Sequence, residues 1–136
     1  MLIETARSVS FQLVGTKECF LVPFESFTNV PFVIKRVFTV HTVLACHRGY
    51  HAHKQCKQLL ICLQGTCVVT VDDSVNQIKV KLTKPNEGLY IPAGIWAEQQ
   101  YTANSILMVL TDQLYDEADY IRNHAEFLQF RENLNV

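Results

Sequence analysis

The sequence predicts an all-β barrel that carries a helix at its C-terminal end. Short apolar runs recur with turn residues between them, at intervals of about 8 to 12 positions. β-Branched and aromatic residues dominate these runs, and only the tail spaces its apolar residues like a helix. With 136 residues the chain is long enough for one sizeable core, so we expect a single domain over residues 1–136.

The first third of the chain supplies three extended segments. FQLVG (11–15) and CFLVPF (19–24) lie on either side of a polar turn at residues 16–18. PFVIKRVFTVHTVL (31–44) is long and rich in β-branched and aromatic residues, which favour extended backbone. We therefore expect strands in each of these runs.

Five further apolar runs follow. QLLICLQG (58–65) ends at a glycine, and TCVVTVDD (66–73) ends at an acidic turn. NQIKVKL (76–82) alternates polar and apolar residues with a period of two, which is typical of a strand with one buried face. GLYIPAGIW (88–96) contains proline and glycine turn residues, and SILMVLT (105–111) closes the series. The predicted barrel thus spans about residues 8–112.

The tail has a different pattern. Its apolar residues recur at helical intervals: Tyr120, Ile121, Phe127 and Leu128. Acidic residues precede them, at the end of a helix where negative charge is favourable. We therefore expect a C-terminal helix over about residues 117–133.

Composition excludes several classes of function. Hydrophobic residues make up 49% and charged residues 18% of the chain, so it is globular rather than disordered. The formal net charge is −1 and no run of like charges occurs, which argues against nucleic acid or an anionic membrane as a partner. The first residues lack the pattern of a signal peptide, and no apolar stretch is long enough for a membrane span. We expect a cytoplasmic protein.

Cysteine usage agrees with that location. Five cysteines are present, an odd number, and none forms a CxxC pair. Most of them sit inside apolar segments, so we expect reduced thiols rather than disulfides.

The stretch HRGYHAHK (47–54) carries the chemistry. His51 and His53 are two apart, so on a strand both point to the same face. Such a pair can bind a metal, transfer protons or simply pack. Arg48 and Lys54 flank the pair, and cations in these places suit an anionic ligand.

The pattern resembles that of cupin jelly-roll barrels: HxH, a glycine a dozen residues later, and then G-x3-P-x-G. In metal-binding cupins a glutamate and a third histidine complete the site. Here Lys57 or Gln58 occupies the position of the glutamate, with Gln58 keeping the better spacing, and Ala97 occupies that of the histidine. Two imidazoles alone make a poor divalent-cation site, so we expect no metal.

Without a metal, acid–base catalysis is the more specific interpretation of the histidine pair. Imidazole has the unperturbed pKa nearest neutral pH, so one histidine can accept a proton while the other donates one. Two adjacent cationic rings repel each other, which keeps at least one of them neutral. Packing of two satisfied histidines remains the alternative.

Five segments together resemble a narrower family, the dTDP-4-keto-6-deoxyhexose 3,4-ketoisomerases, which are small metal-free cupins of bacterial surface-sugar biosynthesis. They are PFVIKRV (31–37), RGYHAHK (48–54), QLLICLQGTCVV (58–69), GLYIPAGIW (88–96) and YDEADYIRNHAEF (115–127). The resemblance implies a homodimer that acts on a dTDP-linked 4-keto-6-deoxy sugar without a cofactor. The reaction moves the ketone from C4 to C3 through an enediol.

The resemblance also implies roles for individual residues. His51 and His53 are expected to be the base and the acid, in an order that the sequence does not assign. We expect a second set to bind the substrate: Arg36, Arg48, Lys54, Tyr50, Gln58 and Tyr90.

The chain departs from the family pattern at two points. Phe38 and Thr39 stand where members commonly carry a tyrosine that faces the sugar, and Ala97 stands where a polar side chain is common. Tyr50 and Tyr90 are candidate replacements for the missing polar groups.

Two other functions remain open at this stage. One is a 3,5-epimerase acting on the same kind of 4-keto sugar, whose members share the fold but lack HAHK. The other is a non-catalytic cupin that binds a nucleotide sugar, which the substitutions at Phe38 and Ala97 would fit. The C4 configuration of the product also remains open.

Overall fold

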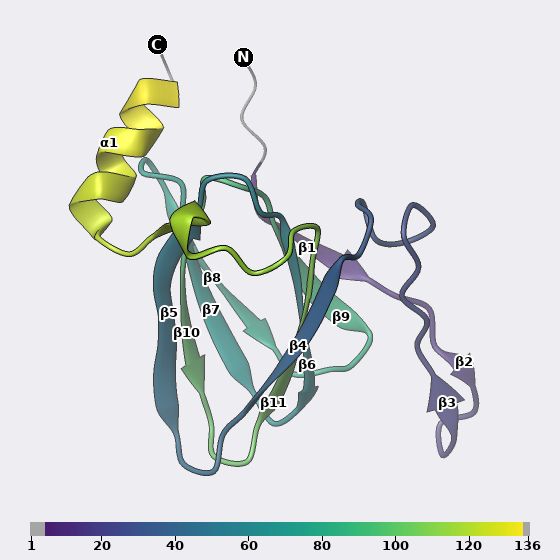
Figure 1. Cartoon of the computed structure of the whole chain (residues 1–136). Coiled ribbons are helices and arrows are strands. Elements are labelled where there is room, and N and C mark those ends of the chain that lie inside the picture. The colour runs from purple at the N-terminus through teal and green to yellow at the C-terminus, as the bar shows by residue number, and fades with distance from the viewer. Residues whose placement is uncertain (1–4, 135–136) are drawn as a thin grey trace.

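The computed structural model describes residues 5–134, and two five-stranded antiparallel sheets form its barrel (Figure 1). The predicted all-β barrel is confirmed; residues 1–4 and 135–136 of the predicted single domain lie outside the described part. The first sheet has the order β1-β9-β6-β11-β4, with bounds Arg7–Ser10, Glu87–Ile91, Gln58–Gln64, Ile106–Thr111 and Arg36–His41. The second has the order β12-β5-β10-β7-β8, with bounds Tyr120–Ile121, Cys46–His53, Trp96–Tyr101, Cys67–Asp72 and Gln77–Leu82.

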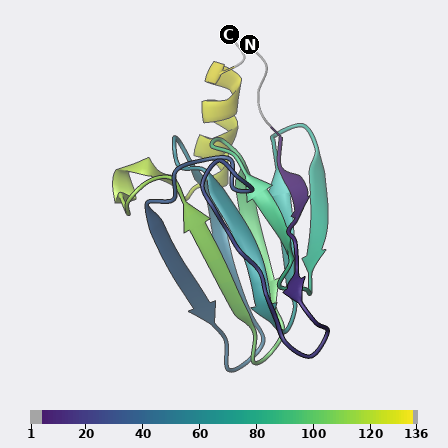
Figure 2. The ribbon, with the colours of Figure 1, turned by 90° about the vertical axis from the view of Figure 1, so that its right-hand side faces the viewer.

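The first sheet is apolar on both faces, which explains why β6 has an almost continuous apolar sequence. Its inner side chains, such as Leu60, join the core between the sheets. Its outer side chains, such as Leu59 and Tyr90, pack under Phe11 and Phe32 of the N-terminal segment. Figure 2 shows this segment crossing the face of the sheet. A sheet covered on both faces requires apolar residues at successive positions rather than alternate ones.

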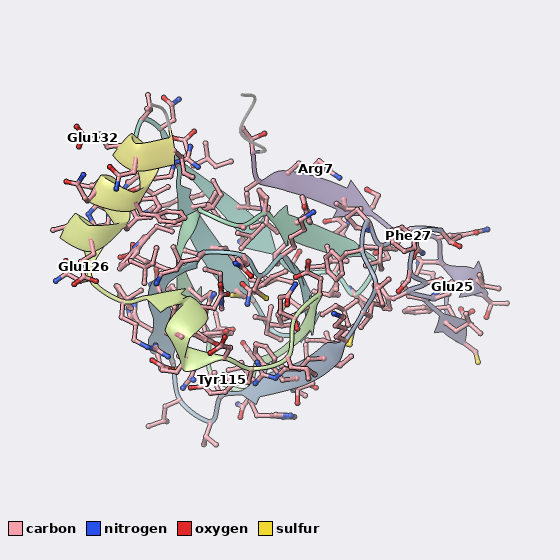
Figure 3. All side chains as sticks on the ribbon, turned by 45° about the horizontal axis from the view of Figure 1, so that its top comes forward. Arg7, Glu25, Phe27, Tyr115, Glu126 and Glu132 are labelled. Atoms are coloured by element: carbon pink, nitrogen blue, oxygen red, sulfur yellow. The ribbon has the colours of Figure 1, made fainter. Side chains whose placement is uncertain are left out.

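α1 (His124–Leu134) packs on the outer face of the second sheet at one end of the barrel, the upper end in Figure 1. Trp96 of β10 packs there against Phe127 of the helix, with ring centroids 5.7 Å apart. The Arg131 guanidinium donates to the carbonyl oxygen of Gly94 and ties the helix to the turn before β10. Glu126 and Glu132, which are exposed, lie on the side of α1 away from the barrel (Figure 3).

The long strand predicted at residues 31–44 is shorter in the structure. Only Arg36–His41 forms β4, because residues before it belong to the segment that covers the outer face of the first sheet. Similarly, the runs at 11–15 and 19–24 contribute only the two-residue strands β2 (Val14–Gly15) and β3 (Phe20–Leu21). This hairpin stands apart from the barrel, on the side opposite α1 (Figure 1).

The prediction of one helix over about residues 117–133 is wrong in its first part. The acidic residues at its start form a single 3-10 turn, η1 (Glu117–Asp119), which leads into β12, and α1 begins only at His124. The Asp116 side chain caps the 3-10 turn by accepting from the backbone N–H of Ala118. The two-residue strand β12 pairs with the end of β5, so the backbone is extended where a helix was expected.

The described cysteines are all free thiols. Cys56, Cys62 and Cys67 are buried, as the sequence predicts, whereas Cys19 is exposed on the β2–β3 connection. No helix within residues 5–134 combines the length and the apolar character that a membrane crossing requires.

Candidate active site

His51 and His53 lie near the end of β5, between β10 and β12. Their ring centroids are 5.0 Å apart with the rings nearly perpendicular. A β-bulge precedes them, because the β5–β10 register shifts between the pairs Ala97–His51 and Glu98–Gly49. Gly49 has a φ of 93°, and a side chain there would meet the Ala97 carbonyl oxygen at 2.9 Å. The bulge therefore requires glycine before the histidine pair.

A cavity of about 580 Å³ opens between the two sheets on the side of His51. Its walls come from β4, β5, β6, β10 and β11 and from the segment that follows β11. The polar or charged side chains in its lining are Arg36, Thr39, His41, Arg48, His51, Gln58, Gln99, Tyr101, Tyr115, Tyr120 and Arg122. Asp, Glu and Cys are absent from this lining within the described residues. A cavity lined in this way favours an anionic ligand.

His51 is the histidine of the pair that borders the cavity. Burial, followed by the proximity of His53, lowers the pKa of His51 from 6.5 to about 4. The ring is therefore neutral at neutral pH. Its Nδ1 is buried and meets no hydrogen-bonding partner among residues 5–134, so the imidazole is not held by a structural contact of that nitrogen.

His53 lies behind His51 and is held by a carboxylate. Its Nδ1 lies 3.0 Å from Oδ2 of Asp119, and only 7% of the residue is exposed. Burial lowers the pKa of His53 although Asp119 opposes this shift. With Nδ1–H donating to the carboxylate, Nε2 is left as an acceptor, and it too lacks a partner in the described part of the chain.

The backbone of the neighbouring loop holds Asp119 in place. Oδ1 of Asp119 accepts from the Gln55 N–H at 2.7 Å, and Oδ2 accepts from the Cys56 N–H at 3.2 Å. The Lys54 N–H donates to the Asp119 carbonyl oxygen at 2.9 Å. The carboxylate is thus fixed by the residues that directly follow His53 in sequence.

Tyr120 packs on both imidazoles. Its ring centroid is 4.9 Å from that of His51 and 4.4 Å from that of His53. Tyr120 also borders the cavity and brings a phenol to the histidine pair. Tyr115 borders the cavity as well and lies 5.7 Å from Tyr120 between ring centroids. In Figure 3 it is seen at the end of the barrel that carries the 3-10 turn.

Three guanidinium groups border the cavity: Arg36, Arg48 and Arg122. Arg122 lies over the Tyr120 ring, 4.3 Å from its centroid, and donates to both carboxylate oxygens of Glu117 at 2.7 and 3.0 Å. This pairing and the Tyr115 hydroxyl lower the pKa of Glu117 to about 2. Arg36 lies over the Phe38 ring at 4.5 Å from its centroid.

The structure brings four of the expected site residues to the cavity: Arg36, Arg48, His51 and Gln58. His53 borders a smaller, adjoining cavity instead.

It does not bring the other three there. Lys54 is exposed beyond the end of β5. Tyr50 has a φ of 59° in the bulge, which turns its side chain outward toward His47. Tyr90 faces the opposite side of the first sheet and packs near Phe32 and Arg7.

Sequence reasoning missed Asp119, Tyr120 and Arg122 as site residues. Their signal was the segment DYIR, which was noted only as part of the resemblance. Because a helix was expected there, its side chains were not expected to alternate between the cavity and the core. Within β12, Tyr120 faces the cavity and Ile121 packs under α1.

The two departures from the expected pattern are also visible. Phe38 borders the cavity and packs against the inner core, so this position offers no hydroxyl. Ala97 is 4% exposed, belongs to the inner core and pairs with His51 across the sheet. The position expected for a third metal-binding histidine is therefore filled by a methyl group.

Comparisons with known proteins find relatives along almost the whole chain. Residues 4–132 match the FdtA family, described as WxcM-like, C-terminal. The TDP-4-oxo-6-deoxy-alpha-D-glucose-3,4-oxoisomerase of Aneurinibacillus thermoaerophilus is 35% identical over 132 residues, which are 96% of this chain and 95% of that protein.

Solved structures give the same result. QdtA, a sugar 3,4-ketoisomerase from Thermoanaerobacterium thermosaccharolyticum solved with TDP, has a TM-score of 0.91 at 32% identity, covering 99% of this chain and 100% of that one. The TDP-quinovose 3,4-ketoisomerase WlaRB from Campylobacter jejuni has a TM-score of 0.88 at 36% identity, covering 93% and 99%. An RmlC epimerase from Mycobacterium tuberculosis, at 13% identity and a TM-score of 0.74 over 88% of this chain and 69% of that one, shares the fold alone. The expected cupin-like architecture is confirmed.

Proposed function

The chain belongs to the FdtA family, and from this premise we propose that it converts dTDP-4-keto-6-deoxyglucose to a dTDP-3-keto-6-deoxyhexose. The chain is an isomerase, a sugar 3,4-ketoisomerase. The observation that carries the assignment is a neutral imidazole, His51, at the wall of a cavity that three arginines border.

The reaction needs a base near C3 of the sugar. The 4-keto group acidifies the C3 hydrogen, so removal of that proton gives an enediol, and reprotonation at C4 leaves the ketone at C3. His51 is neutral and borders the cavity, which suits the base that removes the C3 proton. A single imidazole can also return a proton to C4 on the same face of the enediol.

His53 supports this step from behind. It is held by Asp119, packs against Tyr120, and lies next to His51. In our proposal Asp119 orients His53 and keeps its ring neutral with Nδ1–H donating, so that Nε2 is free to accept a hydrogen bond from His51 once His51 takes up the C3 proton. The sequence predicts a base and an acid within the pair; our proposal makes His51 the base and gives His53 a supporting role.

Hydroxyl protons must also move, because O4 gains a proton while O3 loses one. Tyr120 and Tyr115 border the cavity and carry phenols, whereas Phe38 does not. We assign the proton donor toward the sugar oxygens to Tyr120, because it also contacts both imidazoles. It compensates for the hydroxyl that position 38 lacks.

Arg36, Arg48 and Arg122 suit the diphosphate. A guanidinium group offers paired donors that match phosphate oxygens, and Arg36 and Arg48 balance the two charges of a sugar-linked diphosphate, while the charge of Arg122 is shared with Glu117. Binding of the diphosphate holds the sugar against His51, so that binding energy far from the reacting carbons is used for orientation.

We propose that the reaction uses neither a metal nor a redox cofactor. The proton transfers leave the oxidation state of the whole substrate unchanged. The cavity lining brings two histidines, His41 and His51, and no carboxylate or thiol within the described residues, which is a weak donor set for a divalent ion. We expect a chelator to leave the activity unchanged.

The broader setting is proposed from the chemistry of the product. A 3-keto sugar nucleotide is the substrate that an aminotransferase needs to make a 3-amino-3,6-dideoxyhexose, which suits the biosynthesis of O-antigen or other lipopolysaccharide sugars. We place the enzyme in the cytoplasm, where sugar nucleotides are made.

A homodimer is proposed from an exposed apolar surface. The β2–β3 hairpin stands apart from the barrel and leaves four large apolar side chains between 43% and 58% exposed: Leu13, Val14, Phe20 and Leu21. Such a group of apolar side chains on a projecting element is typical of a protein–protein contact.

The experiment that tests the function is incubation with dTDP-4-keto-6-deoxyglucose in D2O, followed by NMR. A new 3-keto signal with deuterium at C4 is the expected result. Exchange at C3 and C5 without movement of the ketone would indicate a 3,5-epimerase. Binding of dTDP with no exchange at all would indicate a non-catalytic nucleotide-sugar-binding protein. The ketoisomerase relatives are 30–36% identical, whereas the epimerases of similar fold are 13–15% identical, which favours the first outcome.

A further inference from the structure

A second, much smaller cavity of about 10 Å³ adjoins the active site behind His53. That volume is about the room that one water molecule occupies. Its walls include His53, Cys56 and Asp119, and one donor atom from each of the three lies within 4.8 Å of the other two. We propose that these three residues form an inhibitory binding site for Zn²⁺, which takes His53 and Asp119 out of the active-site arrangement.

The donor types fit this ion. Imidazole nitrogen, thiolate sulfur and carboxylate oxygen are the ligands that Zn²⁺ takes in proteins, and three protein ligands with a water in the fourth position make a common zinc site. His53 and Cys56 are buried, and the side chain of Asp119 is 12% exposed. The three donors are thus largely shielded from solvent, and they border a cavity with about the room of one water molecule.

The distance between the His53 and Asp119 donors is close to that of a zinc site, and the Cys56 sulfur lies within 4.8 Å of a donor atom of each. Two ligands about 2.0–2.2 Å from a tetrahedral zinc ion are roughly 3.4 Å apart, and a sulfur about 2.3 Å from the ion is roughly 3.6 Å from a nitrogen ligand. His53 Nδ1 and Asp119 Oδ2 are 3.0 Å apart, so a small opening suffices. Cys56 Sγ now donates weakly to the Lys57 carbonyl oxygen at 3.6 Å, a contact that it can give up when its side chain turns toward the ion.

The charges around the cavity are mixed. Arg36 borders it and opposes a cation, while Asp116 borders it and favours one. The thiolate and the Asp119 carboxylate neutralise the two charges of the ion, so the occupied site is neutral, one unit more positive than the empty site with its Asp119 carboxylate.

Binding changes the protonation of the pair in a defined way. The ion forms bonds to Nδ1 of His53, Sγ of Cys56 and one carboxylate oxygen of Asp119, and the thiol proton leaves to solvent. The proton of His53 moves from Nδ1 to Nε2, which turns Nε2 from an acceptor into a donor. The consequence for catalysis rests on the proposed function, because His53 is the group that stabilises the cationic state of His51.

The first test is spectroscopic and needs no activity. CoCl2 is titrated into the whole metal-free protein under a reducing, thiol-free buffer. We expect one equivalent to produce the visible bands of tetrahedral Co²⁺ with a thiolate charge-transfer band, and ZnCl2 to displace it. Cys56→Ser and Cys56→Ala should both lose the charge-transfer band, whereas Cys19→Ser, which removes an exposed thiol, should keep it. Loss with Cys19→Ser, or no thiolate band in the wild type, overturns the proposal.

The second test uses turnover. One equivalent of ZnCl2 should lower the rate of the wild-type protein by roughly tenfold or more, because the support to the general base is removed, and a chelator should restore it. Cys56→Ser should isomerise at the wild-type rate and resist zinc. If the thiolate band forms but turnover does not change, the inhibitory role is overturned. If the wild type binds Co²⁺ but isomerises no sugar, the proposed function fails instead.

Discussion

His51 and His53 have the same side chain and share one face of β5, but they meet different surroundings. His51 borders the cavity and carries no charge at neutral pH, whereas His53 is held by Asp119 and is almost completely buried. The period of two along a strand predicts that both side chains share a face, but it does not predict how deeply each one is buried. The difference arises because β12 closes over the end of β5 that carries His53.

Replacement of His51 by Asn should abolish most of the activity. Asn keeps a polar side chain but removes the titratable nitrogen, so we expect turnover to fall by about 10²–10⁴-fold, with exchange at C3 lost as well. His53→Asn should also lower turnover but leave slow exchange at C3, since His51 is still in place. Calorimetry with dTDP should show nearly unchanged affinity for both variants. Wild-type turnover in both variants would show that the pair only packs.

The arginines in the cavity lining predict that cations inside the cavity contribute to dTDP binding and that cations outside it do not. Arg48→Ala and Arg122→Ala should each weaken dTDP binding by about 1.5–3 kcal/mol, which is the worth of one charged hydrogen bond. Lys54→Ala is the matched control, because Lys54 is close to Arg48 in sequence but lies outside the cavity lining. Calorimetry measures the three affinities. An equal loss in all three would indicate a general effect of surface charge rather than a binding site.

At the scale of single residues, the sequence predicts which kinds of side chain form the site better than it predicts which side chains bond to one another. HxH between two cations indicated an anion-binding acid–base site, and Arg36, Arg48, His51 and Gln58 do border one cavity. Tyr50 was displaced by the bulge at Gly49, because one extra residue reverses the face that follows. Nothing in the local sequence around His53 predicts its pairing with Asp119, 66 positions away.

At the scale of elements, the segment between β11 and α1 matters most for the site. It carries η1 and β12 and supplies Asp119, Tyr120 and Arg122. Helical periodicity suggested one continuous helix here, but the Asp119 carboxylate accepts from backbone N–H groups of the loop after β5 and from His53. These tertiary hydrogen bonds hold the segment in an extended form against β5. The spacing of apolar residues along the sequence carries no information about such contacts.

Asp119→Asn tests this segment. The amide keeps the shape and one accepting oxygen but loses the charged acceptor that fixes the Nδ1–H tautomer of His53, so we expect kcat to fall about tenfold or more, which corresponds to the loss of one charged hydrogen bond worth about 1.5–3 kcal/mol. The KM for the sugar nucleotide should change little. Nitrogen NMR of the His53 ring should show an altered tautomer or pKa.

The control is Asp116→Asn, three residues earlier in the same segment. Asp116 caps η1 through Ala118, and Asn is an equally good cap. Its kcat and the His53 signals should match those of the wild type. If both variants lose activity to the same extent, the segment acts only through its stability and Asp119 has no orienting role.

For the whole molecule, the layers explain both the predictable and the unpredictable parts of the fold. Apolar residues such as Leu59 and Leu60 fill both faces of the first sheet, so the runs that predicted strands were strong signals. Residues 22–34 were less predictable, because they pack on the outside of that sheet without forming strands of it. Their apolar sequence resembles that of a strand although their role is that of a cover.

The exposed hairpin predicts the oligomeric state. Phe20→Glu together with Leu21→Glu should convert the proposed dimer into a monomer, because charges replace two exposed apolar side chains on one projecting element. Light scattering at matched concentration measures the mass. Val75→Glu is the control, since Val75 is 82% exposed on a different turn and should leave the mass unchanged. A wild-type protein that is monomeric throughout would reject the dimer.

The buried histidine pair also predicts how stability depends on pH. Burial, chiefly, lowers the pKa of His51 to about 4 and lowers that of His53 from the ordinary value of 6.5. Above pH 6.5 both histidines are neutral in the folded and the unfolded chain, so their contribution to stability is fully present. As the pH falls below 6.5, the unfolded chain binds protons that the folded chain does not, and the free energy of unfolding decreases until the folded pKa is reached.

We therefore expect the free energy of unfolding to fall between pH 6.5 and pH 5, a window in which most carboxylates do not yet titrate. Each histidine contributes at most about 1.4 kcal/mol per pH unit. Urea titrations at several pH values in this window measure the slope. The double variant His51→Gln/His53→Gln should have a markedly smaller slope, whereas His47→Gln, which removes an exposed histidine of the same strand, should keep that of the wild type. Equal slopes in all three proteins would show that the pair is not buried in its neutral form, and the assignment of His51 as a neutral base would fall with it.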